Sequence, residues 1–312
     1  METLAHILRK NKERRGYIDF DIDEAKIIVN EKGEAIDVKV RERGTGEKLI
    51  EDFMIAANEC VAQHIYYMNL PFIYRVHEYP KEEKIKSFLS FLSNLGYSIK
   101  GNIRDNKPTT IQKLLHFLKD KKEYKILSSL LLRSMQKAVY KEENLGHYGL
   151  ASTCYTHFTS PIRRYPDTTV HRLLRTYLFH HDMSHETIHH WQDKLVYVSD
   201  KASACERAAV DCEREVDDMK MAEYMEGHIG EEYDGMISSV LSFGMFVELE
   251  NMIEGLVPIR DMNDYFIYDE ERMTLTGEKS HIKYTIGDKV RIKVVRASKE
   301  EKTIDFEIIK KL

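Results

Sequence analysis

The sequence contains no long hydrophobic run. No stretch approaches the roughly 18 consecutive apolar residues that a membrane-spanning helix needs. Met1 is followed by polar and charged residues rather than by the apolar core of a signal peptide. We therefore expect a soluble, cytoplasmic protein that makes no contact with a membrane.

Cysteine is scarce as well. The four cysteines are Cys60, Cys154, Cys205 and Cys212, and no two of them form a CxxC pair. Neither a zinc ribbon nor a disulfide framework is indicated, and a reducing compartment is the simplest setting. We expect these side chains to be small residues of the core.

Metal-binding spacings are also missing. The 14 histidines include no HExxH-type arrangement, so a metal ion would have to be held by carboxylates. Asp19, Asp21 and Asp23 lack the glycine and the distal glutamate of a calcium loop, and we expect no metal there. The net charge of −5 argues against indiscriminate coating of nucleic acid, which relies on many Lys and Arg residues. A channel with a locally basic lining is compatible with this charge.

Hydrophobic periodicity indicates a helix-rich first part. Helical spacing predicts helices over residues 3–10, 49–67, 81–95, 110–119, 123–140, 167–179 and 199–226. Residues 17–21 read as strand-like, and residues 25–40 alternate as a hairpin with its turn at 31–34. In the last of these helices, the stripe expected to be buried consists of Cys205, Ala208, Cys212, Val216 and Met219.

Near Gly230 the pattern changes to short strands. Five segments, over residues 231–241, 244–250, 252–259, 288–297 and 302–309, suit a five-stranded OB-type barrel. A length of 312 residues also favours about two domains. We predict an α+β chain, with one domain over residues 1–228 and an OB-fold β-barrel over residues 229–312.

The stretch TSPIRRYPD, residues 159–167, has the composition of a phosphate-binding turn. Pro161 suits the first turn of a helix, so Thr159 and Ser160 are expected to cap a helix whose free N–H groups attract anions. Arg163 and Arg164 add donors that match phosphate oxygens. The alternative interpretation is that both arginines are ordinary surface charges.

The segment around this turn, residues 147–174, closely resembles the catalytic RNB domain of the exoribonuclease family that includes ribonuclease II and ribonuclease R. The stretches SPIRRYPD and LPFIYRVHE favour the ribonuclease R branch, although no role is assigned to Arg75 or His77. These bacterial enzymes degrade RNA from its 3′ end. The resemblance implies a helix-rich domain with a partial sheet, a monomeric protein, and single-stranded RNA as its partner.

The resemblance also implies roles for particular residues. Arg163 occupies the place of an arginine that contacts the scissile phosphate, and Phe20 that of an aromatic that stacks on the terminal bases. Glu51 matches an acidic residue near the 3′-terminal nucleotide, and Glu213 matches a glutamate that helps to position substrate. Without the resemblance, Phe20 would be a buried strand residue, Glu51 an acid at a helix start, and Glu213 part of a solvated face.

The barrel resembles the OB-type RNA-binding module named after ribosomal protein S1, through SFGMFVEL, EGLVPI and GDKVRIKV. Phe243 and Phe246 are candidates for stacking on unpaired bases, and Arg291 and Lys293 for following the phosphates. The alternative for the two phenylalanines is the core of the barrel. Pro258 stands where many members of this module carry a histidine, so that contact is not expected.

The resembled family is thought to use magnesium held by an aspartate cluster near the start of its catalytic domain, with water attacking the phosphate. That motif is not found in this sequence, so we expect no complete metal site and a match to only the C-terminal part of the RNB domain. Two hypotheses follow. The first is a magnesium-assisted 3′-to-5′ exoribonuclease, inactive without the aspartate motif, that degrades single-stranded RNA to nucleoside monophosphates. The second is a non-catalytic RNA-binding fragment.

Overall fold

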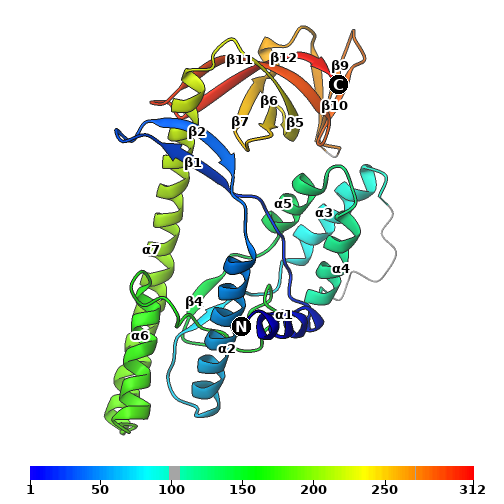
Figure 1. Ribbon diagram of the computed structural model, residues 1–312. Coiled ribbons are helices and arrows are strands. Elements are labelled where there is room, and N and C mark those ends of the chain that lie inside the picture. The colour runs from blue at the N-terminus through cyan, green and yellow to red at the C-terminus, as the bar shows by residue number, and fades with distance from the viewer. Residues whose placement is uncertain (98–105, 271) are drawn as a thin grey trace.

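A helix-rich part and a barrel make up the chain in a computed structural model that describes residues 1–97, 106–270 and 272–312 (Figure 1). The two parts are joined by one long helix, α7, which runs over His185–Glu226 and ends beside the barrel. The fold is therefore α+β, as the sequence predicted.

Six shorter α-helices belong to the helix-rich part. They are α1 (Glu2–Arg15), α2 (Thr45–Tyr67), α3 (Glu82–Asn94), α4 (Pro108–Leu118), α5 (Tyr124–Ser134) and α6 (Tyr165–Leu174), and α6 continues as a π-helix over Arg175–Phe179. Two small sheets accompany them: the hairpin β1 (Ala25–Val29) with β2 (Ala35–Val40), and the antiparallel pair β3 (Tyr74–Val76) with β4 (Val139–Lys141). The partial sheet expected from the sequence is thus two separate pairs of strands.

Several predicted elements are confirmed and others are wrong. The hairpin and the helices predicted over 49–67, 81–95 and 110–119 are present. The helix predicted over 123–140 ends at Ser134, because Val139–Lys141 pairs with β3 instead. Residues 17–21 form no strand; they run as an irregular segment in which the Ile18 amide donates to the Gly149 carbonyl.

Two hydrophobic clusters hold the described part of the chain together. One joins α2, β3, β4, α6 and the first half of α7, and includes Ile65, Tyr177 and Leu195. The other joins α3, α4, α5, the hairpin and the end of α7 to the interior of the barrel. Because the second cluster is continuous across both parts, burial of apolar surface fixes the barrel against the helices.

The predicted buried stripe of α7 is wrong. Cys205, Ala208, Cys212 and Val216 are exposed, and Met219 is half-buried. The buried positions of α7 lie toward its ends, up to Ser203 and from Ala222 onward, and the described elements leave the middle uncovered. The expectation that the cysteines are core residues is correct only for Cys154, since Cys60 is exposed as well.

The barrel is closed by five strands in the order β11-β12-β7-β6-β5. These are β5 (Glu232–Leu241), β6 (Gly244–Leu249), β7 (Glu254–Pro258), β11 (Lys289–Ser298) and β12 (Thr303–Lys311), which correspond to the five predicted segments. Gly255 allows the ring of Phe306 to fill the interior, because a Cβ there would meet that ring at 2.4 Å. A small sheet of β8 (Phe266–Asp269), β9 (Thr274–Gly277) and β10 (Lys283–Thr285) lies between β7 and β11 in the chain, after a 3₁₀ turn over Ile259–Asp261.

None of the described helices combines the length and the apolar character that crossing a membrane requires.

Candidate functional site

A cleft of about 790 Å³ lies against α2 and the segment that leads to α6. It collects polar side chains from parts of the sequence that are far apart; among its lining residues are Arg41, Arg43, Glu51, Asn58, Arg75, His147, Tyr155, His157 and Arg164. Two of the predicted site residues, Glu51 and Arg164, therefore share one cleft.

The arginine turn is closed by a buried carboxylate. Asp167 is fully buried; it accepts the Ser160 amide at 2.7 Å and the Arg164 guanidinium through Nε at 2.9 Å and Nη2 at 2.8 Å. The predicted cap at Thr159 and Ser160 is wrong, because α6 begins only at Tyr165, with Pro166 in its first turn. The carboxylate of Asp167 thus organises the turn that helix capping was expected to organise.

The two arginines of the turn have different environments. Arg164 is held by Asp167 and its side chain is only 18% exposed. Arg163 is exposed and makes no ion pair or side-chain hydrogen bond with any described residue. The guanidinium of Arg163 is therefore free of partners among the described residues, while that of Arg164 donates to Asp167.

Glu51 is held by three neighbours. Its carboxylate accepts the Tyr17 hydroxyl at 3.2 Å and the Arg43 guanidinium at 2.7 Å, and it lies 3.6 Å from the Lys12 ammonium. Lys12 is itself buried and pairs with Asp52 at 2.8 Å. This network fixes Glu51 at the edge of the cleft, where its oxygens can accept hydrogen bonds from a ligand.

A second cluster of polar side chains in the same cleft was not predicted from the sequence. Arg75 pairs with Glu206 of α7 at 2.5 Å and lies 4.7 Å from the ring centre of Tyr140. The Tyr140 hydroxyl is 2.8 Å from Nδ1 of His157. The only signal in the sequence was the LPFIYRVHE stretch, in which Arg75 was assigned no role, and Glu206 was not among the predicted site residues.

The histidines of this cluster are neutral. Burial and the neighbouring Arg164 lower the pKa of His157 to about 2, and burial beside His77 and Arg75 lowers the pKa of His147 to about 3. Burial also raises the pKa of Tyr140 to about 12. The positive charge of the cleft therefore comes from its arginines, whose guanidinium groups remain charged at all relevant pH values.

Phe20 and Glu213, like Ser160 and Arg163 of the arginine turn, are not among the residues that line the cleft. Phe20 is half-buried against the hydrophobic cluster that includes the barrel, and its carbonyl accepts the Tyr124 hydroxyl at 3.3 Å. Glu213 is exposed in the middle of α7, two turns beyond Glu206, or about 10 Å along the axis. Glu206, rather than Glu213, is the acid by which α7 reaches the cleft.

The predicted barrel residues fall into two places. Phe243 is 53% exposed and meets Phe246 edge-on, with ring centres 6.3 Å apart, so Phe243 does not belong to the barrel core. Arg291 donates to Asp234 through Nε at 2.7 Å and Nη2 at 2.9 Å. Arg291 lies opposite Asp234 of β5, and Phe246 lies opposite Ser239 of the same strand. Asp234 and Ser239 are five residues apart, which corresponds to about 17 Å along a strand. The aromatic pair and the basic pair of Arg291 and Lys293 are thus separated along the barrel.

Among the described residues, no group of three or more His, Cys, Asp or Glu side chains is arranged to hold a metal ion. Asp19, Asp21 and Asp23 do not converge on one point, because Asp19 accepts the Asp21 amide and Asp23 pairs with Lys125 at 2.6 Å. The side chains present in the described chain do not fit a magnesium site, which takes oxygen ligands in an octahedral arrangement.

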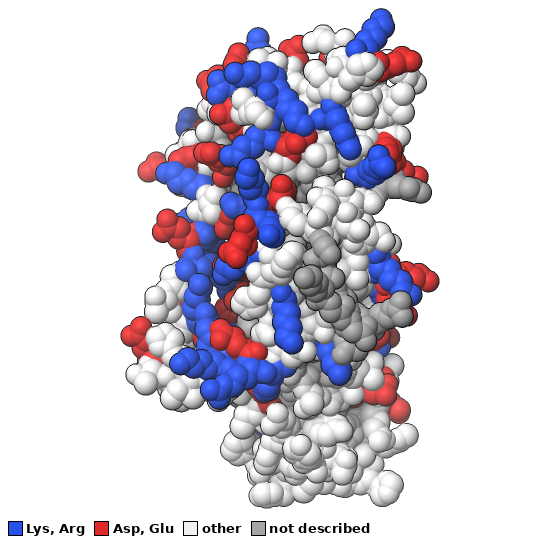
Figure 2. Space-filling model, turned by 90° about the vertical axis from the view of Figure 1, so that its right-hand side faces the viewer, with Lys and Arg blue, Asp and Glu red and all other residues white. Residues whose placement is uncertain are grey.

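Lys and Arg side chains gather on part of the surface in spite of the net charge of −5. Figure 2 shows Lys and Arg side chains gathered along one flank of the molecule, from the barrel down past the helices, with Asp and Glu side chains among them. A charge distribution of this kind attracts anions without producing a uniformly basic protein.

Comparison with known families and proteins gives two domain matches. The RNB domain matches residues 1–180, and the S1 RNA binding domain matches residues 227–309. Ribonuclease R 1 of Lactococcus lactis is 49% identical over 310 residues, which cover 99% of this chain and 38% of that protein.

Two solved structures of a ribonuclease R also match this chain. The apo form of Mycoplasma genitalium RNase R superimposes with a TM-score of 0.93 and 32% identity, over 99% of this chain and 48% of that one. The same protein in complex with ribose-methylated single-stranded RNA gives the same TM-score, identity and coverage. The chain spans less than half the length of these relatives.

Proposed function

Because the chain belongs to the RNB family, we propose that it forms the RNA-holding part of a 3′-to-5′ exoribonuclease of the ribonuclease R type. Its partner is single-stranded RNA, and the product of the complete reaction is a nucleoside monophosphate. The observation that carries the proposal is that the two adjacent arginines differ. Arg164 is held by Asp167 at the cleft that also contains Glu51, and Arg163, next to it in the chain, is exposed.

In this proposal, Arg163 donates to the non-bridging oxygens of the phosphodiester bond that is to be cleaved. Its planar guanidinium matches these oxygens and stabilises the charge that develops on them in the transition state. Glu51 accepts hydrogen bonds from the terminal nucleotide, and Arg43 and Tyr17 keep its carboxylate in place. The roles predicted for Phe20 and Glu213, which lie outside the cleft, remain predictions.

The barrel supplies a second contact with RNA. Phe243 is exposed beside Phe246, and aromatic faces stack on unpaired bases without regard to sequence. Arg291 is paired with Asp234, so it contributes to phosphate binding only by exchanging that partner. We therefore assign the larger share of the barrel's affinity to the aromatic pair.

Hydrolysis requires groups that the described chain does not offer. No described cluster of carboxylates fits a magnesium ion, and magnesium would supply the activated water of this reaction class. We therefore propose that the chain by itself binds RNA without degrading it, as a monomer.

The test measures binding and turnover on the purified 312-residue chain. Single-stranded RNA should bind, as measured by fluorescence anisotropy, while incubation with magnesium should release no nucleoside monophosphates. If the chain does not bind RNA, the proposal is wrong. If the chain releases nucleoside monophosphates by itself, the part that concerns hydrolysis is wrong.

A non-catalytic RNA-binding protein is the second candidate, and the same lack of a metal-holding group favours it. The two candidates differ in what the addition of further polypeptide achieves. The part of the Lactococcus relative that lies outside the region aligned with this chain can be added as a separate polypeptide. Restored release of nucleoside monophosphates would support the first candidate, and continued inactivity with intact RNA binding the second.

A further inference from the structure

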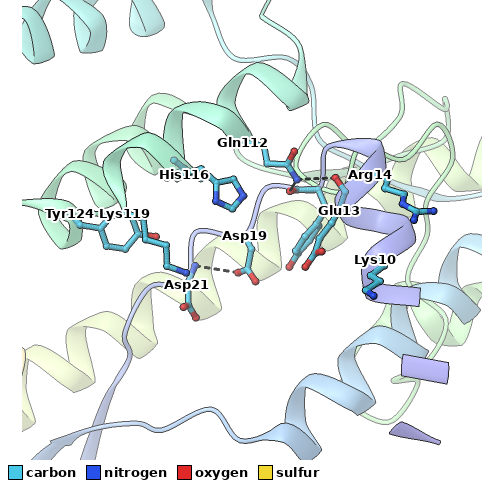
Figure 3. Close-up of a pocket in the computed structure, with 11 residues that line it drawn as sticks. Lys10, Glu13, Arg14, Asp19, Asp21, Gln112, His116, Lys119 and Tyr124 are labelled. Atoms are coloured by element: carbon cyan, nitrogen blue, oxygen red, sulfur yellow. Dashed lines mark hydrogen bonds between the residues drawn. The ribbon is translucent and has the colours of Figure 1, made fainter. Parts of the chain in front are cut away.

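A pocket outside the cleft lies between α1, the segment after it, and α4 (Figure 3). Its volume is about 620 Å³, within the range of small-molecule sites. Leu115 forms part of its wall, and Gln112 ties its two sides together by donating to the carbonyls of Glu13 at 2.9 Å and Tyr17 at 3.0 Å. The pocket is therefore a fixed part of the fold rather than a gap between unconnected surfaces.

Cations without a partner line this pocket. The side chains of Lys10, Arg14 and Lys119 make no ion pair or hydrogen bond with any described residue. Figure 3 shows Lys10 and Arg14 at one end of the pocket and Lys119 at the other. Lys10 and Arg14 are four residues apart on α1 and so project from the same side of the helix. Such a pair can bind one anionic group together.

The remaining side chains limit the kind of anion. Glu13, Asp19 and Asp21 also line the pocket, so its carboxylates equal the Lys and Arg residues in number. A neutral balance does not concentrate a polyanion such as RNA, whose binding depends on an excess of cations. It suits a small ligand with one anionic group and several hydroxyl or amino donors for the carboxylates.

Ring surfaces complete the site. The side chains of Tyr17, His116 and Tyr124 line the same pocket, and Figure 3 shows His116 projecting between α1 and the end that holds Tyr124. Planar rings of this kind stack on a nucleobase and contribute about 1–3 kcal/mol per base. Phosphate, hydroxyl and base partners are therefore present together.

The pocket adjoins the cleft through one contact. Tyr17 lines the pocket, and its hydroxyl donates to Glu51, which lines the cleft. Burial, with Asp19 and Glu51 nearby, raises the pKa of Tyr17, so this hydroxyl stays protonated and continues to donate.

We propose that this pocket binds a nucleoside 5′-monophosphate, the product class of the reaction. Lys10 and Arg14 bind its phosphate, Asp19 accepts its ribose hydroxyls, and its base lies against Tyr124 and His116. The inference rests on the proposed function for the identity of the ligand, but the binding itself can be measured without any cleavage of RNA.

The test is isothermal titration calorimetry of the whole chain with adenosine 5′-monophosphate, inorganic phosphate and adenosine. We expect the nucleotide to bind at least tenfold more tightly than either part alone. The double variant K10A/R14A should bind it about tenfold more weakly or worse, since a hydrogen bond to a charged group contributes about 1.5–3 kcal/mol. The variant H116A should lower the affinity for the nucleotide but not for phosphate.

The control is K113A, which removes a cation of α4 that does not line the pocket; its affinity should match that of the unmodified chain. Exposed side chains are changed in K10A/R14A, so its thermal midpoint should also be unchanged. The inference is wrong if K10A/R14A binds the nucleotide normally, or if phosphate alone binds as well as the nucleotide.

Titration of the same proteins with single-stranded RNA separates this inference from the proposed function. K10A/R14A should keep its affinity for RNA; an equal loss of RNA affinity would show that the pocket belongs to the RNA site and would overturn the inference. Nucleotide binding without any RNA binding would support the pocket and contradict the proposed function. RNA binding without nucleotide binding would support the proposed function and contradict the inference about the pocket.

Discussion

Asp167 and Arg164 form a two-pronged ion pair in which the carboxylate is fully buried and the guanidinium is 18% exposed along its side chain. The same carboxylate accepts the amide of Ser160, seven residues earlier. Adjacent arginines in one turn thus have separate tasks, because Arg164 satisfies a buried charge while Arg163 is left to the solvent.

The first prediction concerns the stability of this turn. Replacing Arg164 with Ala should lower the free energy of unfolding by about 3 kcal/mol, because it leaves the buried charge of Asp167 without its partner. Replacing Arg163 with Ala should change it by less than about 0.5 kcal/mol, as is usual for exposed positions. Urea unfolding of both variants measures the difference, and equal losses would contradict the assignment.

The second prediction concerns turnover. In the full-length Lactococcus relative, replacing the arginine equivalent to Arg163 with Ala should reduce the single-turnover rate far more than the affinity for RNA. The reason is that the guanidinium interacts most strongly with the charge that develops in the transition state. Rates and affinities are measured on the same single-stranded substrate. Equal reductions of both would show that the arginine serves ground-state binding instead.

The third prediction concerns pH. The folded chain lowers the pKa of His157 to about 2 and that of His147 to about 3, whereas both titrate near 6.5 when unfolded. The unfolded chain therefore binds two protons that the folded chain excludes. These two histidines should leave stability unaffected above about pH 6.5 and lower it below that pH, together by up to about 2.7 kcal/mol per pH unit. Burial also lowers the pKa of the half-buried His77, which adds to the loss.

Urea unfolding between pH 7 and pH 4 measures this dependence. Replacing His157 with Phe should reduce the slope of the unfolding free energy against pH by the contribution of one proton. This holds whatever the substitution does to stability at pH 7. Replacing the exposed His6 with Gln should leave the slope unchanged. A slope that His157→Phe does not alter would show that other groups cause the loss of stability in acid.

The fourth prediction concerns the thiols. Cys60, Cys205 and Cys212 are exposed and Cys154 is buried. Burial also raises the pKa of the Cys154 thiol to about 12, which keeps it from forming the reactive thiolate. An aromatic disulfide reagent should label three thiols in the folded chain, and the fourth only after unfolding in urea. Slow labelling of Cys205 and Cys212 would show that the middle of α7 is covered in solution.

The fifth prediction compares the two predicted RNA contacts of the barrel, the aromatic pair and the basic pair. Replacing Phe243 with Ala should weaken RNA binding by about 1–3 kcal/mol, the contribution of stacking on one base, without loss of stability. Replacing Arg291 with Ala should have a smaller effect, because its guanidinium is paired with Asp234. Replacing Tyr265 with Ala is the control for Phe243→Ala, because Tyr265 is another exposed aromatic of the same domain. The order of the effects would be reversed if phosphate contacts dominated.

The barrel and most of the helices could be predicted because their signals are local. Alternation along a strand such as Val290, Ile292 and Val294 identifies which face is buried, and the turns between strands set the ends of the segments. The middle of α7 could not be predicted in the same way. Its apolar spacing identifies a face, but no spacing within a helix reveals whether another element covers that face.

The site was predicted in part for a related reason. The sequence identified both Arg163 and Arg164 as candidates for phosphate binding, but only the fold places Asp167 where it can bind one of them. Arg75 and Glu206 are 131 residues apart, and nothing in the sequence near either indicates the other. Contacts of this kind depend on how β3 and α7 pack together, which local patterns do not contain.

The uncovered middle of α7 has a mechanical consequence. The helix is anchored at one end by Trp191, Leu195 and Val198, in the cluster that also contains α6, and at the other by Ala222 and Met225, in the cluster shared with the barrel. Between these anchors, its rigidity depends mainly on the helix-forming tendency of its own residues, since no side chain from Ala204 to Met221 is buried. The helix thus acts as a strut of about 60 Å, and a proline near its centre would kink it and weaken this link between the barrel and the arginine turn.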